Sequence, residues 1–209
     1  VEVVRQRMEP DLEHLIDAVE QIIAQTRLRL AGVMPESKAR RVSLFDGDAR
    51  PIRKGSLAKP TQFGYTGQVT DNPDGIVLDY ELEAGIPPDG PRLGPAIERI
   101  IAAVGATPDA VTADRGYGLA SVDTQLEDLG VDLVAIPRKG QPGTARRDAQ
   151  SEDRFVELVK WRTGSEGRIA TLKRQHGWER ARNRGLEGAR IWCGWGVLSH
   201  NLVKIAVLT

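Results

Sequence analysis

The chain has 209 residues and a mass of 22.9 kDa, which is the size of one ordinary domain. Its 29 Lys plus Arg balance its 29 Asp plus Glu, so the formal net charge is zero, which excludes a uniformly basic surface but not a local basic face. A single cysteine, Cys193, excludes a disulfide framework and a thiolate metal site. No stretch approaches the roughly 18 apolar residues of a membrane span. We therefore expect a soluble, cytoplasmic protein without a membrane partner.

The first segment has the pattern of an amphipathic helix. Apolar residues recur at spacings of three and four over residues 8–30, and glycine and proline follow. We treat residues 1–35 as a helix that precedes the core and residues 36–209 as the main domain. The apolar stripe is expected to pack inward, with Arg27 and Arg29 in solvent.

The rest of the chain predicts an α/β domain. Three strand-like segments come first, with a turn signal before the third, and indicate an antiparallel meander. Helices then alternate with short apolar strands, as in parallel βαβ units. This order is that of the RNase H-like fold, with further helices flanking the sheet. The expected strands are 42–45, 62–70, 76–83, 110–113 and 133–136, and the expected helices are 95–104, 119–129, 152–175 and 186–208, with a loop at 138–147.

Three aspartates follow expected strands. Asp46 and Asp48 come after the strand VSLF, and Asp114 comes after the strand AVTA. Ligands of open α/β sheets bind where such strands end, so these carboxylates are candidates for a functional site. Aspartate beside glycine is also ordinary turn chemistry, and that interpretation remains open for each of them.

A fourth acidic residue lies in the basic helical segment. Arg162, Glu166 and Lys173 are four and seven residues apart, so one continuous helix would place them on a single stripe. Gly164 and Gly167 flank the glutamate although glycine weakens helices, which indicates the close approach of a ligand or another backbone. The alternative is a solvated face in which Arg162 and Glu166 form an ion pair.

Together these segments resemble one known family. They are VSLFDGDARPIRKGSLAKPTQFGY, VTADRGYG and VKWRTGSEGRIATLKRQHGWERARNRGLEGARIWCGWGVLSHNLVKIA, within residues 40–209. The sequence resembles the DDE transposases of bacterial insertion sequences, which have a retroviral-integrase-like RNase H fold. The last block is similar to the family's Tyr-x2-Arg-x3-Glu-x6-Lys signature. Arg162, Glu166 and Lys173 match it, and Val159 replaces the tyrosine.

The resemblance implies a metal-binding triad of two aspartates and one glutamate. Asp114 matches the second aspartate and Glu166 the glutamate. Both Asp46 and Asp48 fit the first: Asp46 is nearer the strand, whereas relatives have an acidic residue at the position of Asp48. Two divalent ions, Mg²⁺ or Mn²⁺, are implied, because a metal pair about 3.5–4 Å apart activates the attacking oxygen and stabilises the leaving oxygen of a phosphodiester. Carboxylates are the ligands that such hard ions prefer.

Cations are concentrated toward the end of the chain. Residues 138–190 contain 14 Lys plus Arg and seven Asp plus Glu, a distribution that suits the binding of DNA phosphates. Trp178 is either a base-stacking residue or an ordinary core residue. The expected contacts to DNA are Arg138, Lys139, Arg162, Lys173 and Trp178.

We therefore expect a metal-dependent transposase that cleaves and joins double-stranded DNA at insertion-sequence ends. It would act as a homodimer on DNA and associate with the nucleoid. One alternative is a nuclease of the same fold that only hydrolyses, and another is a non-catalytic, decayed DNA-binding remnant. The first residue is Val, and no DNA-reading module is recognisable, so we expect the catalytic core of a longer protein or a truncated copy.

Overall fold

The computed structural model describes the backbone of residues 2–36, 39–53 and 61–209, and the side chains of these except 2–10, 165 and 166. The chain forms two compact units whose segments alternate along the sequence. Unit 1 comprises residues 1–68, 81–87 and 181–193. Unit 2 comprises residues 69–80, 88–180 and 194–209.

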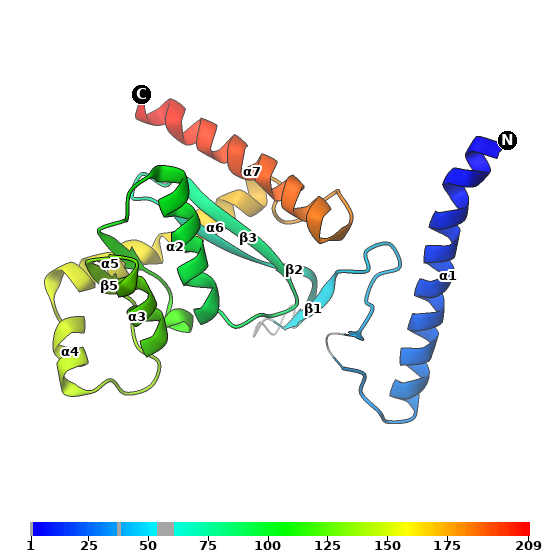
Figure 1. Ribbon diagram of the computed structural model, residues 1–209, viewed down its shortest axis with the longest axis horizontal. Coiled ribbons are helices and arrows are strands. Elements are labelled where there is room, and N and C mark those ends of the chain that lie inside the picture. The colour runs from blue at the N-terminus through cyan, green and yellow to red at the C-terminus, as the bar shows by residue number, and fades with distance from the viewer. Residues whose placement is uncertain (1, 37–38, 54–60) are drawn as a thin grey trace. The chain divides into compact units, whose positions relative to one another are not determined.

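Unit 2 contains the predicted alternation of helix and strand, which is confirmed (Figure 1). The two strands pair in parallel, and Val111 lies opposite Val134. Helices and strands share one core, in which Ile97, Leu126 and Ile136 are fully buried. The elements are α2 (Gly90–Val104), β4 (Ala110–Thr112), α3 (Ala120–Asp128) and β5 (Leu133–Ala135).

A three-stranded sheet in the order β1-β2-β3 corresponds in part to the predicted meander: β2 and β3 match the expected strands 62–70 and 76–83, whereas β1 lies in a segment with no expected strand. Its strands are β1 (Arg50–Arg53), β2 (Thr61–Asp71) and β3 (Val77–Ala84). β1 runs antiparallel to β2. The turn between β2 and β3 is held by Asn72, whose side-chain oxygen accepts the N–H of Ile76 at 2.8 Å. Gly75 has φ 79° in this turn, a conformation that glycine adopts readily.

The prediction of a strand at residues 42–45 is wrong. This segment is irregular, and its backbone groups bind side chains instead of a neighbouring strand. The guanidinium of Arg41 donates to the carbonyl oxygens of Ser43 and Leu44, at 3.0 and 3.1 Å. The hydroxyl oxygen of Ser43 accepts the backbone N–H groups of Phe45 and Asp46, which lie two and three residues further along the chain. Such local bonds compete with a strand ladder.

The prediction of one continuous helix over 152–175 is also wrong. Helix α5 (Asp153–Thr163) ends and α6 (Ser165–Gln175) begins at Gly164. The N–H of Gly164 bonds to the carbonyl oxygen of Trp161 at 3.1 Å, the spacing of a tightened last turn. Arg162 therefore lies on another helix than Glu166 and Lys173, which remain seven residues apart on α6. The expected single stripe does not extend to Arg162 through one continuous helix. A further short helix, α4 (Thr144–Gln150), begins within the expected loop.

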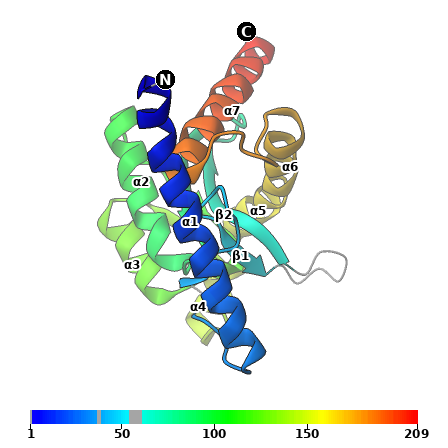
Figure 2. The same ribbon diagram turned by 90° about the vertical axis from the view of Figure 1, so that its right-hand side faces the viewer.

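Helix α1 (Glu2–Leu30) is a single uninterrupted helix in unit 1 (Figure 2). Its predicted apolar stripe does not pack inward: Leu12 and Ile16 are 58% and 50% exposed. A neighbouring face is covered instead, and Ala18 on it is fully buried. Arg27 and Arg29 are exposed, as expected.

Among the described residues, helix α7 (Gly185–Leu208) is the one helix that is both long enough and apolar enough to cross a membrane. Its mean hydropathy is 1.3 over a window of 18 residues. Length and composition alone do not distinguish a membrane span from a helix of a globular domain. In unit 2, α7 is tied to the β2–β3 hairpin: His200 bonds to the carbonyl oxygen of Gly75 at 2.9 Å, and Asn201 bonds to both backbone groups of Val77. Val197 packs with Val77 in a small core cluster.

Candidate functional site

The segments that follow β4 and β5 lie together at the carboxyl ends of these parallel strands. Arg115 joins them, because its guanidinium donates to the carbonyl oxygens of Arg138 and Gly140, at 3.0 and 3.1 Å. Gly118 has no space for a side chain, since a Cβ there would overlap the carbonyl oxygen of Pro137. The close approach of two backbones therefore requires this glycine. Ligand sites of open α/β sheets form at such an edge.

Asp114 stands at this edge as predicted, separated from the last residue of β4 by Ala113, and its side chain is exposed. Its Oδ1 accepts the N–H of Gly116 at 2.5 Å, a cap contact at the start of the short 3-10 helix Arg115–Tyr117 that also orients the carboxylate. The cap interpretation therefore applies to Asp114 as well, and its metal-binding role remains a prediction. A Cβ at Gly116 would be 2.6 Å from that oxygen and 2.5 Å from Oδ2 of Asp89. The carboxylates of Asp114 and Asp89 therefore border one small space that the missing side chain leaves open.

Tyr117 lies beside this cluster. Burial, with smaller contributions from the carboxylates of Asp89 and Asp114, raises the pKa of its hydroxyl to about 12 against the opposing effect of Arg92. The phenol therefore stays protonated at neutral pH.

Asp89 is a residue that the sequence analysis missed. It immediately precedes α2, which has proline in its first turn, and an aspartate there is a common helix-start signal. That signal predicts a helix boundary and gives no reason to pair Asp89 with Asp114. Only the fold brings the start of α2 to the end of β4.

The other two aspartates lie in unit 1, where each has a structural contact. Oδ1 of Asp46 accepts the hydroxyl of Tyr65 at 2.6 Å and the N–H groups of Asp48 and Ala49. Burial, followed by the hydrogen bond to Asp46, raises the pKa of Tyr65 well above its usual range. Oδ2 of Asp48 accepts the N–H of Leu186 at 3.0 Å, at the start of α7. These are the turn and cap contacts that the sequence left open.

Glu166 lies on α6 in unit 2, and its side chain is outside the described part of the chain. Arg162 is half-buried on α5, and its Nε has no hydrogen-bond partner among the described residues. Lys173 is half-buried on α6. Among the described residues no group of three or more His, Cys, Asp or Glu could hold a metal ion. The convergence of Asp114 and Glu166 with the first aspartate remains a prediction.

The basic segment contains structural ion pairs as well as exposed cations. Arg138 and Arg146 both bind the buried carboxylate of Asp123, at 2.9 and 3.1 Å. Burial raises the pKa of Asp123, and the two guanidinium groups oppose that shift. Lys139 is exposed, with no such role evident in the described contacts. The expected DNA contacts of Arg138 and Lys139 remain predictions, but Arg138 also fastens its loop to α3.

Trp178 packs in the small core cluster beside Leu172 and Val197. Its ring stands edge-on to Tyr80, with centroids 6.0 Å apart, and Gly196 lies close beneath it. These contacts agree with the core interpretation of Trp178. Stacking on a base remains a prediction without further support.

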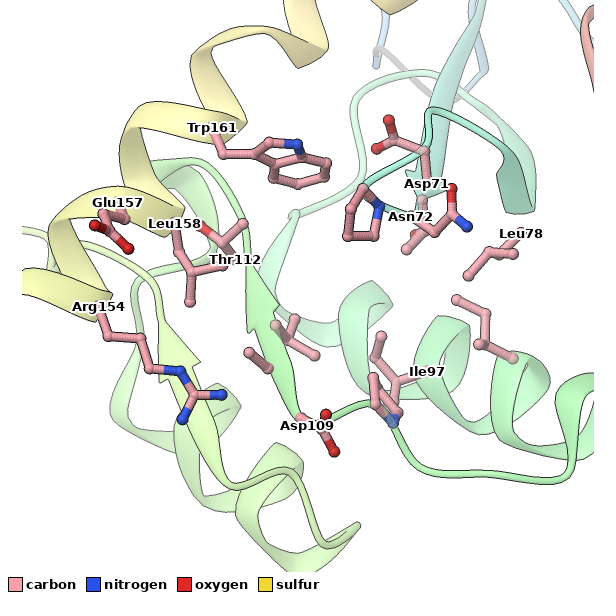
Figure 3. Close-up of a pocket in the computed structure, with 16 residues that line it drawn as sticks. Asp71, Asn72, Leu78, Ile97, Asp109, Thr112, Arg154, Glu157, Leu158 and Trp161 are labelled. Carbon is pink, nitrogen blue, oxygen red and sulfur yellow. The ribbon is translucent and has the colours of Figure 1, made fainter. Parts of the chain in front are cut away.

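A pocket of about 590 Å³ lies elsewhere in unit 2 and contains none of the predicted site residues (Figure 3). All of β4 lines it, together with Ile97 of α2 and Leu158 and Trp161 of α5. Residues of β5 do not line it, so it borders the edge of β4 away from β5. Its walls are mainly apolar, unlike the Asp89–Asp114 cluster.

A divalent ion fits the residues around Gly116. Asp89 and Asp114 offer hard oxygen donors on either side of a space that a Cβ would fill. Mg²⁺ commonly binds through one or two carboxylates and keeps several waters, so two aspartates beside solvent suit it. The exposure of Asp114 leaves room for a substrate oxygen.

Residues 38–202 match the transposase DDE domain family. The match covers well over half of the chain, and the chain belongs to this family. The resemblance inferred from the sequence is thereby confirmed. Membership implies transposase-type action on DNA, and proteins of this family generally use divalent metal ions. Comparisons with curated proteins and with solved structures give no match.

Proposed function

We propose that this chain is the catalytic domain of a transposase that cleaves DNA at insertion-sequence ends and transfers the freed strand to a target, using two divalent ions. The observation that carries the proposal is Asp114, an exposed carboxylate at the end of β4 that faces Asp89 across Gly116, in a chain of the transposase DDE domain family. In cleavage, water attacks the phosphorus and the 3′ oxygen leaves as a hydroxyl. In transfer, that hydroxyl attacks a target phosphodiester and displaces the target's 3′ oxygen.

The carboxylates orient the reacting groups. Asp114, fixed by the N–H of Gly116, would bind one ion together with Asp89, and Glu166 with Asp46 or Asp48 would complete the set. Bound divalent ions supply activation of the attacking oxygen and stabilisation of the leaving oxygen. The half-buried Arg162 and Lys173 would hold the DNA backbone near these carboxylates.

The experiment is a strand-transfer assay in Mg²⁺. A labelled duplex with the terminal repeats that flank the coding sequence serves as donor, and a plasmid serves as target. We expect cleaved and joined products. Asp114→Asn and Glu166→Gln should each lower both by about 100-fold or more, because a nearly isosteric amide removes a charged metal ligand. Asp148→Asn, an exposed aspartate of the basic segment, is the matched control and should retain activity.

The same assay separates the two alternatives. Nicked plasmid without joined product, in the presence of a free 3′ hydroxyl, would assign the chain to the hydrolysing nucleases. DNA binding without any cleavage, unchanged by Asp114→Asn, would assign it to the non-catalytic remnants. Full activity of Glu166→Gln would remove Glu166 from the metal site. Dimerisation on DNA is tested by the mass of the complex.

A further inference from the structure

Helix α1 has two apolar faces, and the described part of unit 1 covers only one of them. The covered face includes the fully buried Ala18 and the half-buried Leu15 and Ile22. It is fastened to the following segment through Gln25, whose amide donates to the carbonyl oxygen of Arg41 at 2.6 Å and accepts the N–H of Arg41 at 3.1 Å. The covered face of α1 thus contacts the rest of unit 1, and this contact does not involve the exposed apolar face.

The second face, which we call the α1 stripe, lies about 100° further round the helix at 100° per residue. Its apolar members are between 43% and 84% exposed. Their spacing alternates four and three residues, which is the heptad repeat of a two-helix seam. The α1 stripe consists of Leu12, Ile16, Val19, Ile23, Thr26 and Leu30.

The charges beside the stripe identify the partner and its direction. Residues 9–20 contain five acidic residues and no Lys or Arg, whereas Arg27 and Arg29 lie in the last turn. A second α1 in the antiparallel direction places its basic end against this acidic half. A parallel copy would place acid beside acid, and like charges on facing helices are destabilising.

The apolar positions are self-complementary in the same alignment. If two copies cross near residue 21, Leu12 faces Leu30 of the second copy and Val19 faces Ile23 of the second copy. The remaining pair is Ile16 against Thr26. Each layer then pairs an a position of one helix with a d position of the other, as antiparallel two-helix seams require.

We infer that α1 binds a second copy of this chain through the α1 stripe, as an antiparallel two-helix contact. The inference does not depend on the proposed catalysis, because none of the residues that it uses belongs to the candidate active site. The stripe is shorter than three heptads, so the dimer should be of modest affinity and form with rising concentration.

The first test measures the mass of the whole chain by sedimentation equilibrium at protein concentrations from about 1 to about 200 µM. This range suits the modest affinity that we expect of a short seam. The chain should shift from monomer toward dimer. Ile16→Asp with Ile23→Asp should weaken association at least about tenfold, because two charges enter an apolar seam. Ala24→Asp with Leu28→Asp places the same charges on the other exposed side of α1 and should leave association unchanged. A monomer throughout, or equal effects of both doubles, would overturn the inference.

The second test is the direction of the contact. Leu12→Cys and Leu30→Cys chains should form a disulfide with each other in a mixture, and neither should form one alone. The native Cys193 does not compete, because it is buried and burial raises its thiol pKa to about 11. Self-linkage of Leu12→Cys alone would show parallel helices and overturn the antiparallel arrangement. Circular dichroism confirms that each variant remains folded.

Discussion

Oδ2 of Asp89 and Oδ1 of Asp114 both border the empty Cβ position of Gly116, although one aspartate precedes α2 and the other follows β4. The two carboxylates can therefore approach each other because residue 116 has no side chain between them. If this pair binds a divalent ion, the glycine is as necessary as the acids.

We predict that Gly116→Ala lowers Mn²⁺ affinity and DNA cleavage together by at least about tenfold, because a Cβ would come within 2.6 Å of both carboxylate oxygens and force them apart. Electron paramagnetic resonance measures the bound Mn²⁺ independently of activity. Gly143→Ala is the control, since its φ is −62° and no atom lies within 4 Å of the new Cβ. Unchanged Mn²⁺ binding in Gly116→Ala would separate the Asp89–Asp114 pair from the metal.

A second prediction concerns the buried carboxylate of Asp123. Its pKa is raised above the unfolded value, so the folded chain keeps the proton to higher pH, and the stability this provides is lost as pH rises through the raised pKa. Arg146→Ala removes one of the two cations that oppose the shift. We expect a loss of about 3 kcal/mol at pH 8 that shrinks below the carboxyl pKa, where a protonated Asp123 needs no cation.

Urea unfolding at several pH values tests this expectation. In an Asp123→Asn background the same Arg146→Ala change should cost a similar amount at every pH, since no titrating group remains. A pH-independent loss in the native background would show that Arg146 acts through its bond to the carbonyl oxygen of Ile136 instead.

Sequence pattern predicted α2, β4, α3 and β5 of unit 2 because apolar periodicity in these elements corresponds to burial. The strands around Val111 and Val134 are short and apolar, and the helices between them have one buried face. The position of Asp114 was also predictable, because a residue that follows a buried strand lies at the edge of the sheet; its role as a metal ligand remains a prediction. The family resemblance depended on short motifs that are contiguous in sequence and need no knowledge of packing.

The failures have different physical causes: local side-chain hydrogen bonds, a glycine at a helix end, and a long-range approach of two segments. Residues 42–45 have strand composition, but Arg41 and Ser43 bind the groups that a strand would pair. Gly164 ends α5 where spacing alone indicated a continuous helix. Asp89 was missed because no local pattern relates the start of α2 to the end of β4.

A third prediction tests the glycine beside Glu166. A Cβ at Gly167 meets no atom within 4 Å, so Gly167→Ala should stabilise α6 by about 0.5–1 kcal/mol. If glycine is there to permit the approach of DNA, the same variant should bind DNA several-fold more weakly. Thermal unfolding and DNA titration measure the two effects separately. A more stable protein with unchanged DNA affinity would leave Gly167 without a role in binding.

The last prediction locates the DNA path by its charge. Lys139 and Arg174 are exposed in the basic segment, and Arg27 and Arg29 are exposed on α1, so neither pair has a buried contact to lose. Arg174, Arg27 and Arg29 also lie in the last turns of their helices. Removing each of them therefore costs a comparable favourable interaction with the helix dipole. Because bound phosphates release counterions, log affinity falls with log salt by about 0.9 per phosphate contact. Lys139→Ala with Arg174→Ala should flatten this slope by up to about 2.

Arg27→Ala with Arg29→Ala should leave the slope nearly unchanged. The measurement is a salt titration of DNA binding at nanomolar protein, where pairing through α1 is not populated and only direct phosphate contacts contribute. Both doubles retain the candidate carboxylates, so the result does not depend on which aspartates bind metal. Equal slopes in the two, or a larger loss from the α1 pair, would place the DNA away from the basic segment and remove the electrostatic support for the transposase proposal.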